Sequence, residues 1–531
     1  MRRIVLLIAV VSLLASACIA GGDNIVSNGP SSSTTFAPLA AGDTTTTTVG
    51  ATVTDGSDPS STTTTPITTT TEPIRPAGVV TGDTVYEPWG TVTGITMFRG
   101  NPTRTYFGSG PLPDSPPELA WQFPEQAMAA QSPVGTKTRW WTGTGWTGQP
   151  VVWERPDGVT EVIFGAYDKK IHFLDAATGE RTRPDYSMGE IIKGSVTLDP
   201  DGYPLLYTGS RDPRFRILAL DEDEPYEVWS LHARDVEGMW NDDWDANAVV
   251  VDDMLYIGGE NSWWYAVKLN RAIDDGGKVG VDPEVVYTIP AWTDELFDDL
   301  GNQHSIENST AVFGQAAYFA TSAGRVVGVD LTNIESGGGE VFFDFWVGDD
   351  TDATITIDDE GFVYVVAHAD HAKSNNKAAR RIREVGHLVK LDTSLEGDDA
   401  IVWKQELPAA RGQDAGAWAT PALHPDGLLF VATDAGDLQA YDTETGELVW
   451  DDFVGANAWS SPVIVDDKLL IAVNCLTENH ALRVYDLSDP TAPDQLYEVV
   501  VGGGCIESTP AVWEGRVFVG SRDGFFYALE S

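Results

Sequence analysis

Short apolar runs separated by turn residues repeat through the second half of the chain. Between residues 417 and 457 the runs are Thr420–Leu423, Leu428–Ala432, Leu438–Tyr441 and Leu448–Trp450. Each run has the length of a strand and suits a pleated sheet, and the Asp, Gly and Pro residues between the runs favour tight turns. The stretch therefore predicts one small antiparallel sheet of four strands, which needs copies of itself to bury both faces.

The same pattern recurs twice before the chain ends, beginning at Ala458 and at Glu507. Pro421, Pro462 and Pro510 occupy equivalent places in the three copies, 41 and 48 residues apart. A period of this size is typical of a propeller blade, and the stretch lacks the apolar periodicity of a helical repeat. We therefore predict a β-propeller.

Counting such units along the chain gives eight, with inner strands expected near residues 148, 194, 246, 309, 353, 420, 461 and 509. The eighth unit has only three strands, while PELAWQFP at Pro117–Pro124 resembles the outermost strand ELVW at Glu447–Trp450. Pairing this upstream segment with Phe525–Leu529 would close the ring and remove an exposed sheet edge. The predicted fold class is all-β: an eight-bladed β-propeller of four-stranded antiparallel blades, with the last blade closed by an N-terminal strand at about 117–124.

The first residues have the pattern of an export signal. In Met1–Ala17, two arginines precede the apolar run Ile4–Leu14, which is too short to span a bilayer. Ala-Ser-Ala before Cys18 is similar to a bacterial lipoprotein processing site, so Cys18 is the expected lipidation site. The alternative is an ordinary secretory signal with a cysteine nearby. We expect a protein of the bacterial cell envelope, lipid-anchored to the membrane on its extracytoplasmic face.

Four regions follow from these patterns. Residues 1–17 are the expected lipoprotein signal peptide, and residues 18–76, rich in Thr, Ser and Pro, predict a disordered tether. Residues 77–116 form a lead-in segment that we expect to pack on the propeller of residues 117–531. A tether beside a lipidated cysteine would hold this head, which we expect to be a monomer, away from the membrane.

The chain is strongly acidic, with 80 Asp and Glu against 33 Lys and Arg residues and a formal net charge of −47. Such a surface repels nucleic acid, so we expect no nucleic-acid partner. One interpretation is an acidic face for cationic partners or calcium, and the other is solubility in a salty habitat.

Two cysteines, Cys475 and Cys505, remain after Cys18. In an exported protein two cysteines can form a disulfide, and both are expected on the same rim of adjacent blades. We predict a disulfide between Cys475 and Cys505; the alternative is two buried free thiols.

Several repeats resemble a known propeller family. AYDTETGELVW at Ala440–Trp450, FLDAATGERTR at Phe173–Arg183 and DGFFYALE at Asp523–Glu530 look like the repeat of PQQ-type propellers, and Met97–Pro113 resembles their lead-in segment. This family includes the quinoprotein dehydrogenases and the eight-bladed outer-membrane assembly lipoproteins. The resemblance implies the fold but no activity, because the same repeat serves enzymes and scaffolds. It also implies that one aromatic residue per outer strand docks between blades, here Trp121, Trp229, Tyr287, Trp403, Trp450 and Tyr497.

Tryptophans and carboxylates gather in the loops of one propeller face, where the blades connect and where second strands turn into third strands. Exposed indoles beside carboxylates suit stacking on a flat ring or a sugar, and they equally suit gripping a peptide. The alternative is that they fill the central channel and pack the loops. The candidate ligand-binding residues are Trp140, Trp141, Trp240, Asp243, Trp244, Trp263, Trp264, Trp292, His304, Glu307, Trp418 and Trp459.

No motif assigns a metal site. His368, Asp370 and His371 are potential ligands in one loop, but they form an incomplete set. The acidic turn Asp221–Glu224 lacks the Gly and Glu of a calcium-binding EF-hand loop. We therefore assign no metal ligand and no catalytic residue.

Two classes of function compete. The first is a binding or scaffolding module that captures an envelope protein or a carbohydrate through the tryptophan- and aspartate-rich face. The alternative is a dehydrogenase that oxidises an alcohol or sugar with PQQ and calcium, using carboxylates such as Asp243 and Glu307 beside the indoles. The resemblance implies adjacent paired cysteines for the alcohol-oxidising enzymes, and the chain has neither that pair nor a C-x-x-C-H haem motif. We expect the binding module, with no cofactor assigned; a sensor or structural surface protein is a third option.

Overall fold

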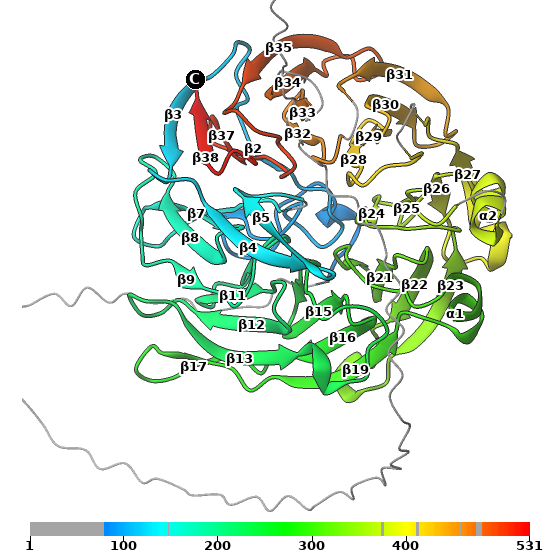
Figure 1. Cartoon of the computed structure of the whole chain (residues 1–531), viewed down its shortest axis with the longest axis horizontal. Coiled ribbons are helices and arrows are strands. Elements are labelled where there is room, and N and C mark those ends of the chain that lie inside the picture. Colours follow the sequence, from blue (N-terminus) through cyan, green and yellow to red (C-terminus); the bar gives the residue numbers. More distant parts are fainter. Residues whose placement is uncertain (1–78, 147, 373–375, 410–413, 456–457, 474–479) are drawn as a thin grey trace, which may run out of the picture. The chain divides into compact units, whose positions relative to one another are not determined.

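The computed structural model describes residues 79–146, 148–372, 376–409, 414–455, 458–473 and 480–531 (Figure 1). The expected signal peptide, the tether and Cys18 lie outside the described residues. The described residues of 79–132 and 138–531 belong to one compact unit, which contains the propeller. None of the described helices is long and apolar enough to cross a membrane.

The described residues form eight antiparallel blades around a central channel, so the predicted fold class is confirmed (Figure 1). Within each blade the strands run from the channel outward, and the next blade starts again at the channel. Blade 1 contains β6 (Val151–Glu154), β7 (Thr160–Gly165), β8 (Lys170–Asp175) and β9 (Tyr186–Ser187), and blade 2 contains β10 (Thr197–Leu198), β11 (Leu205–Thr208), β12 (Arg214–Ala219) and β13 (Tyr226–His232). Blade 3 contains β14 (Val249–Val251), β15 (Met254–Gly259), β16 (Trp263–Lys268) and β19 (Glu284–Pro290), and blade 4 contains β20 (Ala311–Phe313), β21 (Ala316–Ala320), β22 (Arg325–Asp330) and β23 (Glu340–Trp346). Blade 5 contains β24 (Thr356–Ile357), β25 (Val363–Val366), β26 (Leu388–Leu391) and β27 (Ile401–Gln405), and blade 6 contains β28 (Ala422–His424), β29 (Leu428–Ala432), β30 (Asp437–Asp442) and β31 (Leu448–Phe453). Blade 7 contains β32 (Val463–Val465), β33 (Lys468–Val473), β34 (Ala481–Asp486) and β35 (Asp494–Val500), and blade 8 contains β36 (Ala511–Trp513), β37 (Arg516–Gly520), β38 (Phe526–Glu530) and β3 (Glu118–Phe123).

The eighth blade is closed by the N-terminal strand that the sequence predicts. β3 pairs antiparallel with β38, which places Trp121 opposite Ala528 and Phe123 opposite Phe526. Because β3 is the outermost strand of this blade, it covers the backbone edge that β38 would otherwise expose. The predicted closure is therefore confirmed.

Two short strands of the lead-in segment also join blades, which the sequence pattern did not indicate. β1 (Gly94–Ile95) pairs antiparallel with β6, and β2 (Gly108–Ser109) pairs parallel with β36. Both add to the channel side of their sheets, so blades 1 and 8 have five strands.

Tryptophans dock on glycines of the next blade, as the resemblance implies. The indole N–H of Trp121 in blade 8 donates to the carbonyl of Ala176 in blade 1 at 3.0 Å, and its ring lies against Gly179. Trp403 of blade 5 lies against Gly446 of blade 6 in the same way; a Cβ there would lie 2.6 Å from the indole, so only glycine leaves room for it. Burying each indole contributes roughly 2–3 kcal/mol.

A closed belt of hydrogen bonds around the channel fastens each blade to the next. For example, the N–H of Thr354 donates to Thr420 Oγ1 at 3.0 Å, and the N–H of Thr420 donates to Ser461 Oγ at 2.9 Å. The last junction is made by the N–H of Thr509 on the Gly148 carbonyl. These buried side chains satisfy backbone donors where water is excluded. We call the equivalent residues, one per blade, the belt: Gln149, Ser195, Asn247, Ser309, Thr354, Thr420, Ser461 and Thr509.

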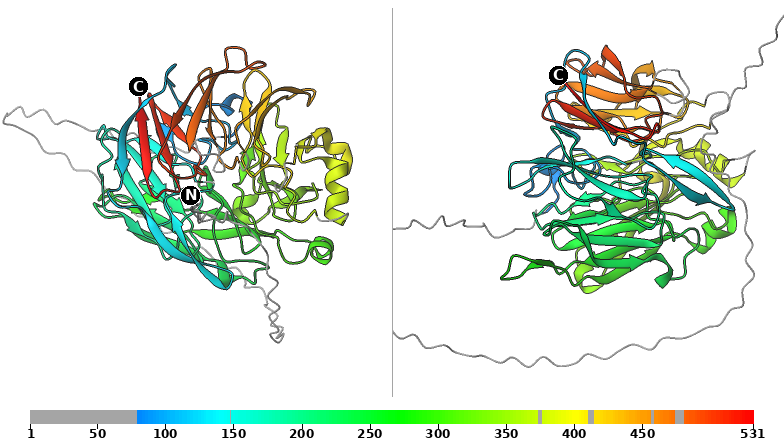
Figure 2. Two further views of the ribbon diagram at one scale, coloured as in Figure 1. Left: turned by 45° about the horizontal axis from the view of Figure 1, so that its top comes forward. Right: turned by 60° about the vertical axis from the view of Figure 1, so that its left-hand side comes forward.

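The lead-in segment fills the channel up to the level of the belt. Its carbonyls accept hydrogen bonds from the inner strands of blades 2, 4 and 5, and Figure 2 shows it, in blue, on one face of the ring. Arg104 donates to the carbonyls of Thr310 and Phe98, and Arg99 donates to that of Thr420. Both arginines are completely buried, and burial lowers the pKa of each guanidinium to about 9. The channel is thus closed from the lead-in face.

The other elements decorate the blades. Thr293 and Asn376 cap the two α-helices, because their side chains accept a backbone N–H of the first turn. The elements outside the blades are β4 (Ala129–Val134), β5 (Lys137–Thr142), β17 (Ala272–Ile273), β18 (Val279–Gly280), α1 (Asp294–Leu300), α2 (Lys377–Val385) and the 3₁₀ turns Gly82–Thr84, Ala233–Asp235, Ile334–Ser336 and Gly397–Ala400.

Cys505 is disulfide-bonded. Its predicted partner, Cys475, lies outside the described residues. The pairing of these two cysteines therefore stays a prediction.

Candidate functional site

One side chain per blade lies just beyond the belt, on the face where the blades connect. These residues stand two positions before the belt residues, and residues two apart in an extended strand point the same way. The lead-in segment contacts the inner strands at the belt and toward their other ends. We call the described members the mouth ring, in order from blade 2 to blade 8: Lys193, Asp245, Glu307, Asp352, Trp418, Trp459 and Glu507.

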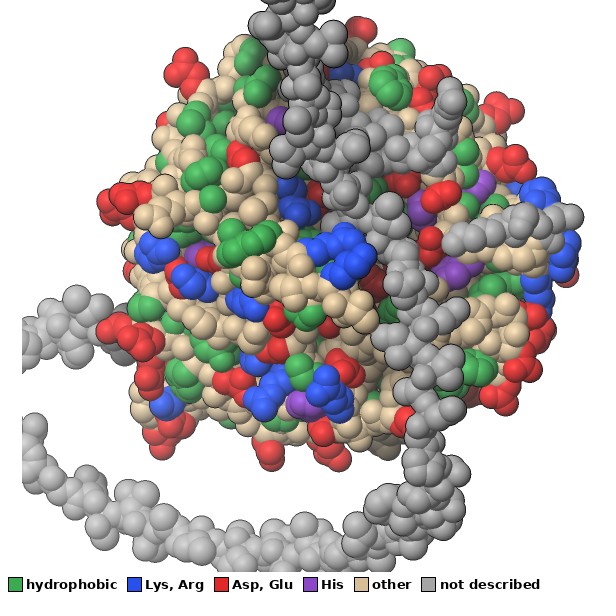
Figure 3. Space-filling view, viewed as in Figure 1, with side chains coloured by type: hydrophobic (Ala, Val, Ile, Leu, Met, Phe, Trp, Pro, Cys, Tyr) green, Lys and Arg blue, Asp and Glu red, His purple; other side chains and the backbone are tan. Residues whose placement is uncertain are grey.

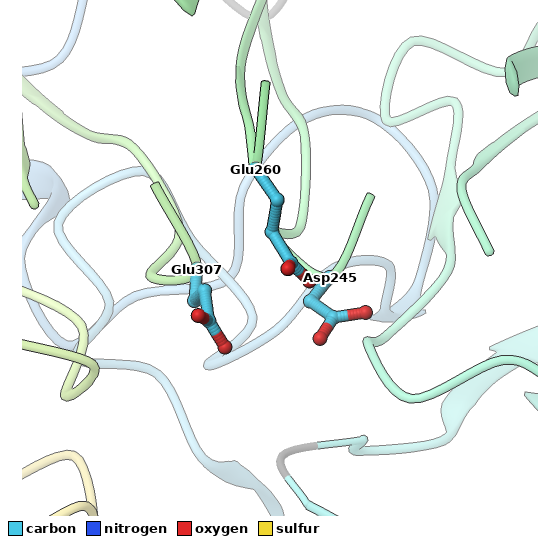
Figure 4. Close-up of side chains that lie close together, drawn as sticks. All are labelled: Asp245, Glu260 and Glu307. Atoms are coloured by element: carbon cyan, nitrogen blue, oxygen red, sulfur yellow. The ribbon is translucent and has the colours of Figure 1, made fainter. Parts of the chain in front are cut away.

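Three carboxylates from blades 3 and 4 converge in this region, and we call them the acidic trio (Figure 4). Asp245 precedes β14, Glu260 follows β15 and Glu307 precedes β20, so all three come from loops of one face. One oxygen atom of each lies within 4.8 Å of the others. Asp245 and Glu260 are buried, only 2% and 3% exposed, and Glu307 is half-buried.

The hydrogen-bonding capacity of the trio is only partly used within the described residues. Asn241 Nδ2 donates to Glu260 Oε2, and Ser305 Oγ donates to Glu307 Oε1, both at 3.0 Å. Glu260 Oε1 and Asp245 Oδ1 accept no hydrogen bond from the described part of the chain. Buried carboxylate oxygens in this state require a nearby positive charge.

Lys193 supplies one such charge and links the trio to a tryptophan. Its ammonium forms an ion pair with Asp245 and lies 3.9 Å from Glu260 Oε1. The same ammonium lies 5.7 Å from the centre of the Trp146 ring, which is a cation–π distance. Burial alone would lower the pKa of Lys193, but attraction to Asp245 and Glu260 raises it well above its usual value, so the ammonium stays charged.

More carboxylates than cations gather here. Burial raises the pKa of Asp352 well above its usual value, with repulsion from Glu307 adding to the shift, and burial raises the pKa of Asp350 in the same way. Burial also raises the pKa of Asp243 to about 6, although Arg211 opposes this shift. We call the whole group, which interacts with Lys193 and Arg211, the acidic cluster: Asp243, Asp245, Glu260, Glu307, Asp350 and Asp352. The cluster thus holds more carboxyl groups than cations, and the raised pKa values favour the neutral, protonated form of Glu260, Asp350 and Asp352.

The mouth ring is aromatic in blades 6 and 7. Trp418 and Trp459 stack with ring centres 4.9 Å apart, and Trp146 lies 5.7 Å from Trp418. Trp459 donates its indole N–H to Asp434 Oδ1 at 3.0 Å. The indole N–H groups of Trp146 and Trp418 have no hydrogen-bond partner among the described residues. The region thus offers ring faces and polar N–H groups beside the carboxylates.

The histidines singled out by the sequence have separate partners. His368 Nε2 lies 2.8 Å from Asp434 Oδ2, and that carboxylate also accepts the N–H of Trp459. His371 Nδ1 lies 2.8 Å from Asp349 Oδ1. Among the described residues, the one group with three converging ligand atoms is the acidic trio rather than this loop.

The structure brings four of the twelve predicted ligand residues to this region. Asp243 and Glu307 belong to the acidic cluster, and Trp418 and Trp459 belong to the mouth ring. Five others belong neither to the mouth ring nor to the acidic cluster. Trp140 is 66% exposed, Trp263 and Trp292 pack edge to face 5.1 Å apart, and Trp141 lies against Arg522, which pairs with Glu507 of the mouth ring. These five are Trp140, Trp141, Trp240, Trp263 and Trp292.

Three predicted ligand residues are core residues, so we correct their assignment to a binding surface. Trp244 is 1% exposed and packs on Phe215. Trp264 is fully buried and stacks on Phe319. His304 is also fully buried; its Nε2 pairs with the Gly301 carbonyl, and burial lowers its pKa to about 4. All three side chains point into the protein: Trp244 and His304 from loops, and Trp264 from strand β16.

Sequence reasoning missed six residues of the site: Lys193, Asp245, Glu260, Asp350, Asp352 and Glu507. A signal existed for the mouth ring, because each member stands two residues before a belt residue. Aligning the repeats at the belt would have placed Lys193, Asp245 and Asp352 in one ring with Trp418. Glu260 carries no such signal, because it comes from the loop between β15 and β16.

A cavity of about 550 Å³ lies elsewhere, between blades 1 and 2 beside the lead-in segment. Trp153, Arg155 and Arg183 line it, but all three donate hydrogen bonds to Glu161. Because these polar groups already have hydrogen-bond partners within the protein, the cavity is a weaker candidate for a ligand-binding site than the mouth ring.

Charge is unevenly spread over the surface. Figure 3 shows acidic side chains along most of the rim of the visible face, with basic side chains gathered near its centre and around α2. α2 is tied to the acidic α1, since Lys377 Nζ lies 3.1 Å from Glu295.

Comparisons with known proteins support the fold. Residues 386–492 match the family model described as outer membrane protein assembly factor BamB. The quinohemoprotein alcohol dehydrogenase of Comamonas testosteroni is 13% identical with a TM-score of 0.53, over 82% of this chain and 80% of that chain. BamB from Moraxella catarrhalis is 13% identical (TM-score 0.38; 83% and 100% covered), and the computationally designed protein Ika8 is 12% identical (TM-score 0.46; 73% and 96% covered). A comparison with curated protein sequences found no significant match.

At these identities the similarity to solved structures concerns the fold alone. The family match covers the end of blade 5, blade 6 and most of blade 7, where the sequence repeat is clearest. Together with the eight blades, it confirms the resemblance drawn from the sequence: the chain has the PQQ-type eight-bladed propeller fold, similar to BamB in its repeat and to a quinoprotein alcohol dehydrogenase in its architecture.

Proposed function

We propose that the protein is a binding module of the bacterial cell envelope whose mouth ring receives a basic segment of a partner protein. The observation that carries this proposal is the presence, in one ring, of unmatched buried carboxylates and stacked indoles. Carboxylates form charge-assisted hydrogen bonds with Lys and Arg, and indole faces attract the same cations. The formal net charge of −47 also draws a basic segment toward the protein and repels acidic competitors.

Three features support a place in the envelope. The chain begins with the pattern of an export signal, Cys18 follows a lipoprotein-like processing site, and residues 18–76 suit a spacer. The matching family model is named for an outer membrane protein assembly factor, which fits an envelope protein with a protein partner. In this proposal a monomeric head is held to the membrane by a lipid on Cys18.

A PQQ- and calcium-dependent dehydrogenase is the second candidate. The acidic trio beside Trp146 favours it, because such an enzyme needs a cation site next to an aromatic surface. PQQ itself carries carboxylates, however, and the acidic cluster would repel it. The chain also lacks the adjacent cysteine pair expected of the alcohol-oxidising enzymes. The residues present therefore do not fit the cofactor, and we favour the binding module.

Calorimetric titration with a Lys- and Arg-rich peptide tests the proposal. The protein should bind this peptide and should not bind one of equal length with Glu in place of Lys and Arg. Replacing both Trp418 and Trp459 by Leu should weaken binding by about tenfold or more, since a desolvated cation–π contact is worth about 2 kcal/mol. Trp450→Leu is the matched control and should bind like the unaltered protein, because Trp450 lies on β31, the outermost strand of blade 6.

Three outcomes would overturn the proposal. The first is peptide binding that survives loss of Trp418 and Trp459. The second is binding of an oligosaccharide, but not of the peptide, that is lost with those tryptophans, which would make the ligand a carbohydrate. The third is oxidation of an alcohol with PQQ, calcium and an artificial dye, which would establish the dehydrogenase.

A further inference from the structure

Lys193 occupies the place that a ligand's cation would take. We infer that the acidic trio and the Trp146 ring form a subsite for one basic side chain of the partner, and that Lys193 fills this subsite until the partner's cation replaces it. The inference rests on the proposed function and deepens it, because it names the recognised group and a competitor built into the chain.

The first support is the state of the trio's oxygens. Asp245 and Glu260 are at least 97% buried; Asp245 Oδ1 and Glu260 Oε1 accept no hydrogen bond within the described residues, and Asp245 Oδ2 meets the Lys193 ammonium. Figure 4 shows the two side chains pointing toward one another, with Glu307 beside them. Oxygens in this arrangement are suited to a positive group that donates several hydrogen bonds at once.

The second support is the position of Lys193, which is independent of the trio's own geometry. This lysine comes from the loop before β10 of blade 2, whereas the trio comes from blades 3 and 4. Its ammonium contacts Asp245, lies 3.9 Å from Glu260 and lies over the ring of Trp146. The structure thus shows that an organic cation on a flexible chain fits here. The Lys193 side chain is 17% exposed, so it has a route out of the subsite.

The surroundings favour an organic cation over a metal ion. Calcium takes six to eight oxygen ligands, whereas one wall of this subsite is the indole face of Trp146, which supplies none. An indole face attracts ammonium and guanidinium groups. Because the acidic cluster outnumbers Lys193 and Arg211, an incoming cation is attracted even before Lys193 leaves.

Substitution of Lys193 tests the inference in the full-length protein. The probe is Nα-acetylarginine amide, which carries one guanidinium and no amine. Lys193→Met should bind it about tenfold more tightly than the unaltered protein, because the internal competitor is gone and the aliphatic stem is kept. Arg211→Met is the comparison variant: it removes an equal charge that pairs with Asp243 and acts on Asp245 and Glu260 without occupying the subsite, so the expected gain is smaller than that of Lys193→Met.

Chemical labelling of Lys193 provides a second readout. Limited acetylation followed by mass spectrometry should find Lys193 poorly reactive in the free protein. Saturating Nα-acetylarginine amide should increase its labelling several-fold, because the displaced ammonium becomes exposed. Unchanged labelling in the presence of bound probe would contradict displacement.

The remaining outcomes separate this inference from the proposed function. If Lys193→Met and Arg211→Met gain equal affinity for Nα-acetylarginine amide, the effect is general electrostatics and the inference is overturned. The inference is also overturned if Lys193→Met binds calcium without any gain in affinity for this probe, because the trio would then be a metal site. If Lys193→Met binds the basic peptide no better while the tryptophan variant loses it, the inference fails and the proposed function stands. If neither protein binds the peptide, the proposed function fails.

Discussion

The belt and the mouth ring lie two residues apart on the same inner strands, yet they differ in how their polar groups are satisfied. In the belt, side chains such as Thr420 and Ser461 accept N–H groups of the preceding blade. In the mouth ring, Asp245 forms an ion pair with Lys193, Asp352 Oδ1 has no hydrogen-bond donor among the described residues, and carboxyl groups gather. The belt therefore has the features of a structural fastening, whereas the mouth ring keeps a charge imbalance that folding alone does not require.

This difference teaches where to look for function in a repeat fold. Every belt position holds a buried polar side chain, and most of these side chains bond to the backbone of a neighbouring blade. A mouth-ring position is free to vary, and it does: it holds Lys193, Glu307 and Trp418 in blades 2, 4 and 6. Substitutions at the two levels should thus have separable effects on stability and on binding.

The largest expected effect is that of Asn247→Ala in the belt. The Asn247 side chain accepts from the N–H of Phe98 and from Arg104, and it donates to the Ser195 carbonyl and to Thr197 Oγ1. Its loss leaves buried partners unsatisfied in both the belt and the lead-in segment. We expect the free energy of unfolding in guanidinium chloride to fall by roughly 3–5 kcal/mol. A fall of less than about 1 kcal/mol would show that the belt does not hold the blades.

A smaller loss is expected for Thr420→Val, which keeps the shape of the side chain. The substitution removes the Oγ1 atom that accepts the N–H of Thr354. One buried donor is then unpaired, at a cost of about 1–2 kcal/mol in the free energy of unfolding. Thr445→Val on an exposed turn is the control and should cost less than half as much, because water replaces the lost contact. Equal losses in the two variants would argue against the belt.

The smallest effect, and the one of opposite sign, is expected for Asp352→Asn in the mouth ring. Burial raises the pKa of Asp352 in the folded protein above its unfolded value of 3.8. The folded state therefore binds more protons than the unfolded state as pH rises above 3.8, and stability falls through this window. The charged and titratable groups that act on Asp352 are Glu307, Asp350, Lys193 and Asp370.

Asp352→Asn removes this penalty, so the variant should unfold at a higher temperature than the unaltered protein at pH 7 and at the same temperature near pH 3.5. The gain should stay below about 1 kcal/mol, because the neighbouring carboxylates remain. Asp426→Asn, an exposed aspartate, serves as the control. A loss of stability at pH 7 would mean that the Asp352 carboxylate is satisfied in the fold, against the comparison drawn here.

The sequence predicted the ring because its repeats are local. Each signal depends only on a short stretch of sequence: the strand-length runs, the turn residues and the ELVW-like segment at Pro117–Pro124. Together these signals predicted eight blades and the closure of the ring. The pairing of the lead-in segment with blades 1 and 8 could not be predicted. β1 and β2 do not belong to the repeat, so the repeat pattern does not indicate that they pair with β6 and β36.

The site was predictable only in part. Asp243, Glu307, Trp418 and Trp459 do lie together on the face where the blades connect. Trp244 and Trp264 are core residues, since composition does not tell whether an indole points inward or outward. The ring itself needed the belt as a reference, and the belt is defined by hydrogen bonds between blades.

The most direct test compares Ser309→Ala with Glu307→Gln, two residues apart in blade 4, for both unfolding free energy and affinity for the basic peptide. Ser309 Oγ accepts the N–H of Asn247, so Ser309→Ala should lose about 1–2 kcal/mol of stability and keep its affinity. Glu307→Gln keeps its size but loses a charge of the trio, so it should keep its stability and bind the peptide about tenfold more weakly. If both variants lose stability and affinity together, or if Glu307→Gln binds the peptide normally, the division of the channel into a structural belt and a ligand-binding ring is contradicted.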